Sequence, residues 1–310
     1  MRTSGFGRCA LTSCVAVALL SGCGGSQPPF GALGAMPQGV TESTQDAHSG
    51  PLLYVSNDGA RDVEVYPAGS KDPSPIETIS SDLEFPSGIC LDGQGTLYVV
   101  DQDGWVVEYP AGKTKPSKII TKGINGPVYC AIDRKGNLWV TNAFGPNVTE
   151  YLHGSTKPHR VITTGLVYPD GITIDHSGNM YVSNGSVGST LNVEVYSPGS
   201  KSPLRTITDG VTSPIGITVD ANGTLYVTNF KENNVEEYRS GQSDPYQTIT
   251  DAMDAPVAVT VNKSGYLYVT NAENFEVVEF APGSIVPSDR QISKSLDNPF
   301  GTAYSPPLLP

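Results

Sequence analysis

The sequence predicts an all-β fold, a six-bladed β-propeller with four antiparallel strands in each blade, and three observations lead to it. An aliphatic–aromatic pair recurs along the chain, and the intervals between its aromatic residues are 44, 41, 42, 45 and 42. Each repeat holds short β-type runs separated by turn residues, the pattern of a propeller blade. The folded region begins and ends with two fragments that together complete one repeat. The pairs are Leu53-Tyr54, Leu97-Tyr98, Leu138-Trp139, Met180-Tyr181, Leu225-Tyr226 and Leu267-Tyr268.

The repeat at residues 214–250 shows the four expected strands in order. Residues 214–220 and 224–229 form the first two, joined by a hairpin turn at Asn222-Gly223, because both residues tolerate positive φ. Residues 234–238 form the third strand. The fourth opens with a proline, which lacks the N–H that a central strand must donate, so it suits the outer edge of the blade. The corresponding prolines are Pro75, Pro116, Pro158, Pro203, Pro245 and Pro287.

The two ends of the folded region predict how the ring closes. Leu52-Leu53-Tyr54 is a second strand with no first strand before it, and residues 298–304 are a first strand with nothing after it. We expect the C-terminal strand to join the N-terminal blade, which leaves no open radial edge. A linear solenoid is the alternative, but it would carry capping units at its ends.

The N-terminus predicts export and a lipid anchor. Residues 1–22 combine Arg2 and Arg8 with a short apolar stretch, as a signal peptide does. Leu20-Ser21-Gly22-Cys23 resembles the lipobox of bacterial lipoproteins, which implies lipidation of Cys23; the alternative is an ordinary secretory signal with a chance cysteine. We expect a protein anchored in the bacterial cell envelope, and Gly24 favours the outer membrane. Residues 23–50 form a flexible tether, and residues 51–310 the propeller.

Charge and cysteine content exclude several classes. The 310 residues include 19 Lys and Arg against 31 Asp and Glu, and loss of Arg2 and Arg8 with the signal leaves 17 against 31, or −14. An exported acidic chain with no basic patch is a poor nucleic-acid binder. Cys90 and Cys130 lie on neighbouring first strands but one position out of step, so we expect them to face different ways as buried free thiols, with a disulfide as the alternative.

Two rings of residues are expected at one mouth of the central channel, where first strands begin and second strands end. One ring follows the strand-opening prolines: Ser87, Val128, Asp170, Ile215, Val257 and Phe300. The other ends the second strands: Asn57, Asp101, Asn142, Asn184, Asn229 and Asn271. This second ring has two interpretations. The side chains bond their own backbone two residues on, which is a structural role, or they recognise a polar ligand.

The pattern Pro-x-Gly-Ile-x-x-Asp-x-x-Gly-x-Leu-Tyr-Val-x-Asn resembles the NHL repeat and, more widely, the six-bladed TolB-like propellers, over essentially all of residues 51–305. NHL repeats usually carry Asp where most units here carry Asn, and an Arg before the third strand that is missing here. Similar propellers include metal-dependent lactonases of the gluconolactonase and senescence-marker family. That resemblance implies Asp170, in Tyr168-Pro169-Asp170-Gly171-Ile172, as ligand to a divalent cation such as Ca²⁺.

The other funnel positions do not complete such a metal site, because Ca²⁺ takes six or more oxygen ligands and this ring is largely apolar. The repeats also resemble those of streptogramin lyases and share the six-bladed plan of peptide-amidating lyases, and the former imply a catalytic His near the funnel. Here His153 and His159 fall in one turn and His176 in a hairpin turn, away from the funnel. The sequence therefore favours a non-enzymatic protein without a cofactor; if it is an enzyme, a lactonase-type hydrolase is the alternative.

Phe144, Phe230 and Phe275 indicate binding instead. They lie in loops between second and third strands on the funnel face, where the repeat itself needs no aromatic side chain. Loops on a rigid scaffold commonly carry binding residues. We therefore expect a monomeric protein that binds an envelope protein, peptide or glycan through Phe144, Phe230, Phe275, Asp101 and Asp170. A subunit of an outer-membrane assembly complex would use the same binding chemistry with another partner.

Overall fold

The computed structural model describes residues 50–185 and 190–307. The predicted signal peptide, Cys23 and all of the tether except Gly50 lie outside the described residues, as does part of the loop that follows Gly185. No helix in the described ranges has the length and apolarity needed to cross a bilayer.

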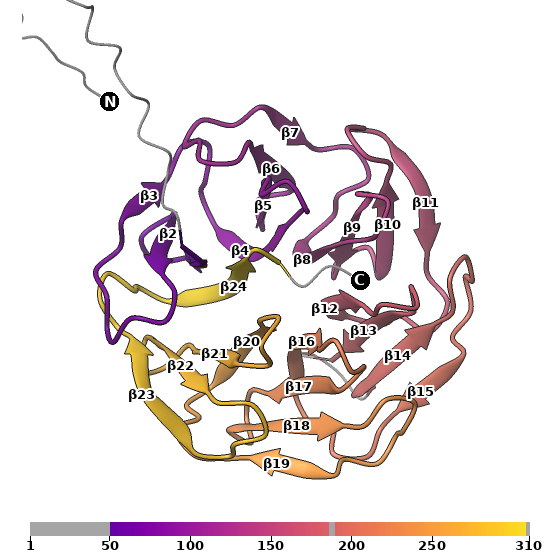
Figure 1. Ribbon diagram of the computed structural model, residues 1–310. Coiled ribbons are helices and arrows are strands. Elements are labelled where there is room, and N and C mark those ends of the chain that lie inside the picture. The colour runs from indigo at the N-terminus through magenta and orange to yellow at the C-terminus, as the bar shows by residue number, and fades with distance from the viewer. Residues whose placement is uncertain (1–49, 186–189, 308–310) are drawn as a thin grey trace, which may run out of the picture. The chain divides into compact units, whose positions relative to one another are not determined.

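Six four-stranded antiparallel sheets form the blades of a propeller, which confirms the predicted fold (Figure 1). Blade 1 consists of β24 (Pro299–Ser305), β1 (Leu52–Asn57), β2 (Asp62–Pro67) and β3 (Glu77–Ile79). Blade 2 consists of β4 (Pro86–Leu91), β5 (Leu97–Asp101), β6 (Trp105–Tyr109) and β7 (Lys118–Ile120). Blade 3 consists of β8 (Pro127–Ile132), β9 (Leu138–Asn142), β10 (Asn147–Tyr151) and β11 (Pro158–Ile162).

The other three blades repeat this order along the chain. Blade 4 consists of β12 (Pro169–Ile174), β13 (Met180–Asn184), β14 (Asn192–Tyr196) and β15 (Arg205–Ile207). Blade 5 consists of β16 (Pro214–Val219), β17 (Leu225–Asn229), β18 (Asn234–Tyr238) and β19 (Gln247–Ile249). Blade 6 consists of β20 (Pro256–Val261), β21 (Leu267–Asn271), β22 (Glu276–Phe280) and β23 (Pro287–Ile292).

The ring closes as the two chain ends predict. Strand β24 pairs antiparallel with β1, with Leu53 opposite Tyr304 and Val55 opposite Thr302. Each inner strand also contacts the inner strand of the next blade, and β24 contacts both β4 and β20. Figure 1 shows β24 completing the blade that the N-terminal strands begin. Pro158 and Pro287 open their outer strands as predicted, at an edge where the missing N–H costs nothing. The other four prolines lie two residues before their outer strands: Pro75, Pro116, Pro203 and Pro245.

The core lies between blades, because each sheet buries both faces against its neighbours. An aromatic residue lies at or next to the end of every third strand and is almost fully buried there. On five blades its hydroxyl donates to a carbonyl in the loop that enters the blade. These residues are Tyr66, Tyr109, Tyr151, Tyr196, Tyr238 and, without a hydroxyl, Phe280. On these five blades the hydroxyl therefore holds the incoming loop to the blade that follows it.

The turn between first and second strands differs in detail from the prediction. Gly223 has the expected positive φ of +83°, but Asn222 is not among the residues with positive φ. Instead the Asp220 carboxylate accepts the N–H groups of Asn222 and Thr224, at 2.9 and 2.7 Å. The loop is thus a tight turn followed by one left-handed glycine, the three-residue form of a hairpin loop.

Cys90 and Cys130 form a disulfide, with Cα atoms 5.8 Å apart, so the expectation of two free thiols was wrong. Cys90 lies on the face of blade 2 that packs against blade 3, and Cys130 lies on the face of blade 3 that packs against blade 2. Neighbouring sheets meet through opposite faces. Two residues one position out of step on adjacent inner strands therefore point toward one another. The alternation argument wrongly excluded this disulfide because it treated the two strands as parts of one sheet.

Candidate functional site

The residue two places after each strand-opening proline sets how closely the inner strands approach. A Cβ atom on Gly216 would lie 2.6 Å from the carbonyl oxygen of Val257 on the next inner strand, closer than such atoms can come. This is the physical reason for the glycine in Pro-x-Gly. The six positions hold Gly88, Tyr129, Gly171, Gly216, Ala258 and Gly301.

Tyr129 and Ala258 are the two exceptions, and the Tyr129 side chain reaches across the central axis. Its hydroxyl donates to the carbonyl of Val257 on the opposite blade at 2.7 Å, and its ring lies 5.5 Å from that of Phe300. Burial, together with the nearby Asp170 carboxylate, raises the pKa of the Tyr129 phenol well above its usual value. The phenol therefore stays protonated and keeps donating. Tyr129 also lines a cavity of about 130 Å³ that is surrounded by the inner strands of all six blades.

A pocket of about 190 Å³ lies on the funnel face and brings two of the predicted site residues together. Phe144 is 72% exposed at its rim, and Asp170 is buried at its wall with 3% exposed. Four of the six residues of the first predicted ring contribute to it. The lining consists of Gln102, Gly126, Pro127, Val128, Ala143, Phe144, Tyr168, Asp170, Ile215 and Phe300.

The backbone and a second ring hold Phe144 in place. It meets Tyr168 edge to face, with ring centroids 6.5 Å apart, and its ring fills the space that a side chain at Gly126 would need. Gly126 has a φ of +62°, which a residue with a Cβ adopts only at a cost. Sequence reasoning missed Tyr168, although its place next to Pro169-Asp170, at the start of a first strand, was the available signal.

Asp101 does not line this pocket. It is fully buried, and its carboxylate accepts the backbone N–H groups of Glu84, Phe85 and Asp103 at 2.7, 3.1 and 3.1 Å. The loop that it holds carries the exposed Phe85, whose ring lies 5.6 Å from the Arg61 guanidinium. The buried carboxylate thus shapes a rim of the funnel face.

The five asparagines of this ring act in the same structural way, but not through their own neighbours as expected. Asn229 accepts the N–H groups of Thr212 and Ser213 and donates to the carbonyl of Gly210 at 2.8 Å. These partners belong to the loop that enters the blade, 16 to 19 residues earlier. Each asparagine therefore staples an incoming loop, and only Asp101 also bonds two residues ahead.

Phe230 and Phe275 lie in the predicted loops but outside the lining of the pocket. Phe230 is half-buried, and its backbone N–H donates to the carbonyl of Ser213 at 2.9 Å. Phe275 is 40% exposed and has a φ of +54°. That left-handed conformation is uncommon for an aromatic residue and favours glycine or asparagine.

The funnel pocket does not fit a divalent cation. Within residues 50–185 and 190–307, no group of three or more His, Cys, Asp and Glu side chains is placed to hold a metal ion. The pocket lining contains one carboxylate, that of Asp170, whereas Ca²⁺ takes six to eight oxygen ligands. The lactonase resemblance therefore finds no matching metal site in this part of the chain.

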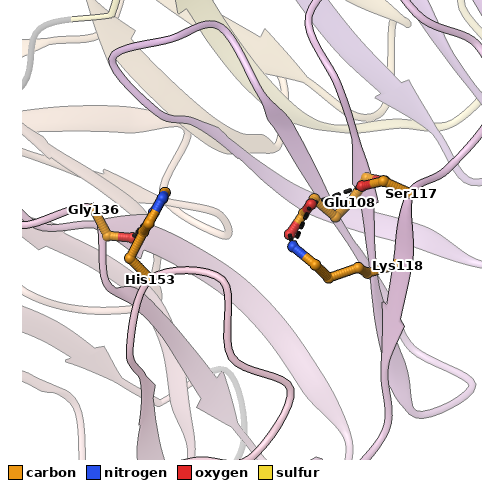
Figure 2. A network of polar contacts seen from close by, with 5 residues as sticks. All are labelled: Glu108, Ser117, Lys118, Gly136 and His153. Atoms are coloured by element: carbon orange, nitrogen blue, oxygen red, sulfur yellow. Dashed lines mark hydrogen bonds and ion pairs between the residues drawn. The ribbon is translucent and has the colours of Figure 1, made fainter.

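The histidines of the propeller lie toward the opposite face. His153 lies in a turn between third and fourth strands and His176 in a turn between first and second strands, but His159 lies in the outer strand β11 and not in the turn expected for it. Nδ1 of His153 lies 3.3 Å from the carbonyl oxygen of Gly136, on the turn between β8 and β9 (Figure 2). His176 lies in the corresponding turn of blade 4. We name this surface the turn face. No histidine lines the funnel pocket.

No protein-family model matches this sequence, and no curated protein sequence matches it. Solved structures match over most of the chain. A chain of the nidogen/laminin complex is 19% identical, with a TM-score of 0.68, covering 83% of this chain and 98% of that one. Hydrazine synthase from Kuenenia stuttgartiensis is 16% identical, with a TM-score of 0.58, covering 74% and 72%. At these identities the likeness shows the propeller fold alone.

Proposed function

We propose that this protein is a non-catalytic, lipid-anchored protein of the bacterial cell envelope that binds a protein, peptide or glycan on its funnel face. The observation that carries this proposal is the pocket formed by Phe144, Tyr168, Phe300 and Asp170. It combines an exposed aromatic rim with a buried carboxylate, as recognition sites do. We retain the NHL-repeat and TolB-like assignment as part of the proposal, on the Pro-x-Gly motif.

The rigidity of the pocket supports binding. Phe144 is braced by Tyr168 and Gly126, so little side-chain freedom is lost when a partner covers it. Tyr129 occupies the axis beside the pocket, so a ligand meets a closed floor there. Aromatic faces suit sugar rings and peptide side chains, and a carboxylate can accept from hydroxyl groups or from a basic side chain.

The disulfide supports export. Disulfides form and persist in extracellular and periplasmic compartments and are rare in the cytosol. The bond between Cys90 and Cys130 therefore agrees with the signal peptide and lipidation expected at Cys23. The structural neighbour in the nidogen/laminin complex is itself part of a protein–protein assembly, which adds a precedent for a propeller that binds a protein.

The test is affinity capture from cell-envelope extracts with the full chain and its Phe144→Ala and Asp170→Asn variants, followed by direct binding measurements on the captured partner. Phe144→Ala should weaken binding by roughly tenfold or more, because exposed aromatic anchors dominate such interfaces. The melting temperature should stay nearly unchanged, because the side chain is 72% exposed.

Leu204→Ala is the matched control, since Leu204 is a large apolar side chain that is 67% exposed just before the outer strand of blade 4. Binding should survive this change. If Phe144→Ala and Leu204→Ala bind alike, the funnel pocket is not the site. If Phe144→Ala lowers stability while binding persists, Phe144 is a packing residue.

A further inference from the structure

A cleft between blades 3 and 4 opens on the turn face and has a volume of about 430 Å³. It lies between the β8–β9 turn of blade 3 and the β12–β13 and β14–β15 turns of blade 4. Its inner wall is apolar, with Trp139, Ile162, Met180 and Tyr196 from the core between the two blades. The volume is within the range of small-molecule sites.

The charged side chains of this cleft are three cations and two carboxylates, a small positive excess in a chain whose formal net charge is −12. Arg134, Lys135 and Arg160 line it together with His159 and His176, against the two carboxylates of Asp133 and Glu150. This local excess of positive charge is opposite to the sign of the whole chain, so it selects for anions at this place on the surface.

Both carboxylates are already engaged by neighbouring protein groups. The Asp133 carboxylate accepts the N–H groups of Lys135 and Asn137 at 2.8 and 2.9 Å, and the indole N–H of Trp139 at 3.2 Å. The Glu150 carboxylate accepts a hydrogen bond from Nε of Arg160 at 2.9 Å. These bonds hold the turn, the indole and the guanidinium in fixed positions.

Arg160 is the preorganised element of the cleft. Its guanidinium carbon lies 4.6 Å from the centre of the Trp139 ring, and the bond to Glu150 fixes it there. On blade 2 the corresponding residue is Lys118, whose ammonium group lies 2.9 and 3.1 Å from the Glu108 oxygens, with Ser117 beside them (Figure 2). A planar cation resting on an indole is therefore a feature of blade 3.

Arg134 lies at the mouth of the cleft. Its Nη2 atom is 2.9 and 2.6 Å from the two ring nitrogens of His176, so a side chain from blade 3 meets one from blade 4. Lys135 is its neighbour on the same exposed turn. The mouth thus presents cationic and imidazole groups, and the interior presents aromatic and aliphatic surface.

We propose that this cleft binds a small organic anion with a ring-shaped apolar body, such as an aromatic carboxylate or sulfonate. The rings lie against the accessible edges of Trp139 and Met180, and the anionic group is held by Arg134, Lys135 and Arg160, because guanidinium groups bind carboxylates and sulfonates through paired hydrogen bonds. This site is independent of the proposed function, since it lies on the other face and shares no residue with the funnel pocket.

The experiment uses the full chain and two matched fluorescent probes, 1-anilinonaphthalene-8-sulfonate and N-phenyl-1-naphthylamine, which have the same rings with and without the sulfonate. The chain has two tryptophans, so Trp105→Phe leaves Trp139 as the only donor for energy transfer to a bound probe. We expect one sulfonate probe per chain, quenching of Trp139 emission, and clearly weaker binding of the neutral probe.

The double variant Arg134→Gln/Lys135→Gln should bind the sulfonate probe about tenfold more weakly and bind the neutral probe with unchanged affinity. The control variant Lys113→Gln/Lys115→Gln removes the same charge from an exposed loop of blade 2, and its affinity for both probes should equal that of the wild type. Equal binding of the two probes, no quenching of Trp139, or equal effects of the two double variants would overturn the proposal. Trp139→Leu, if folded, should abolish the site for both probes.

Discussion

Single residues decide where this propeller departs from its own repeat. Tyr129 replaces the glycine of Pro-x-Gly, and its ring occupies the axis that glycine would leave open. Phe275 takes a left-handed conformation at the last loop position before a third strand, where blades 1, 2 and 5 have Arg61, Gly104 and Asn233, also with positive φ. At the first position an aromatic side chain replaces the glycine found on four blades, and at the second an aromatic residue adopts a backbone conformation that favours glycine or asparagine.

Phe275→Gly should stabilise the protein by about 1 kcal/mol, because glycine adopts positive φ without a Cβ clash. Urea unfolding followed by tryptophan fluorescence measures this change. If Phe275 contributes to the funnel-face interaction, the same variant binds the partner more weakly. A loss of stability would mean that the packing of the Phe275 ring outweighs its backbone strain.

Buried glutamates on the third strands should make stability depend on pH. Burial raises the pKa of Glu64, Glu194 and Glu236 above the usual 4.5, while hydrogen bonds from Thr78, Thr206 and Thr248 oppose the shift. The native state therefore holds these protons more tightly than the unfolded chain does. Their contribution to stability is complete below about pH 4.5 and is lost as the pH rises through the raised pKa values.

The triple variant Glu64→Gln/Glu194→Gln/Glu236→Gln keeps side-chain shape and removes this titration. Because the wild type loses this contribution, the variant should become more stable relative to the wild type, with a larger free energy of unfolding, as the pH rises from about 4.5 to about 8. Urea unfolding at several pH values gives the difference directly. Parallel pH profiles for the two proteins would contradict the assignment.

At the scale of the elements, the blades are held relative to one another by the contacts between neighbouring sheets. Strand pairing within a blade follows from the alternation of apolar residues, but β4 and β8 are not paired by hydrogen bonds. They meet through the core between blades 2 and 3, where the disulfide joins them. This bond links blades whose relative position is otherwise set by apolar packing and by the hydrogen bond that Ser87 Oγ donates to the Val128 carbonyl at 3.0 Å.

Cys90→Ala/Cys130→Ala should lower stability by about 2–4 kcal/mol, because the bond closes a loop with a sequence separation of 40 in the unfolded chain. Thermal unfolding with and without a reducing agent measures it. The wild type should lose stability on reduction, and the double variant should be insensitive. A wild type that unfolds identically in both conditions would mean that the bond adds no stability.

The whole molecule depends on closure by β24. This strand supplies the inner edge of blade 1, and it contacts the inner strands of blades 2 and 6. Without it, β1 presents an unpaired edge, which invites pairing with another chain. Closure therefore protects the ring against aggregation as well as stabilising it.

Truncation after Asn298 should abolish a single cooperative unfolding transition and produce soluble aggregates. Size-exclusion chromatography and circular dichroism test this. The control is truncation after Pro307, which keeps β24 and should behave as the full chain. A monomeric, cooperatively folded protein without β24 would show that apolar packing between blades suffices to hold the ring.

The sequence by itself determined the number of blades, the order of strands and the mode of closure. These features depend on a local pattern, in which apolar and other residues alternate within short runs and turn residues separate the runs. The pattern repeats at a nearly constant interval, so it is recognised without knowledge of the packing contacts. The placement of Phe144 and Asp170 at one mouth of the channel followed from the same repeat.

Only the tertiary structure decided what lies between repeats. The pairing of Cys90 with Cys130, the path of Tyr129 across the axis and the cleft between blades 3 and 4 each depend on how two sheets meet. The asparagine ring bonds loops rather than its own turns for the same reason. Periodicity specifies which face of a strand a residue occupies, but the partner on the next blade is set by the close approach of the inner strands.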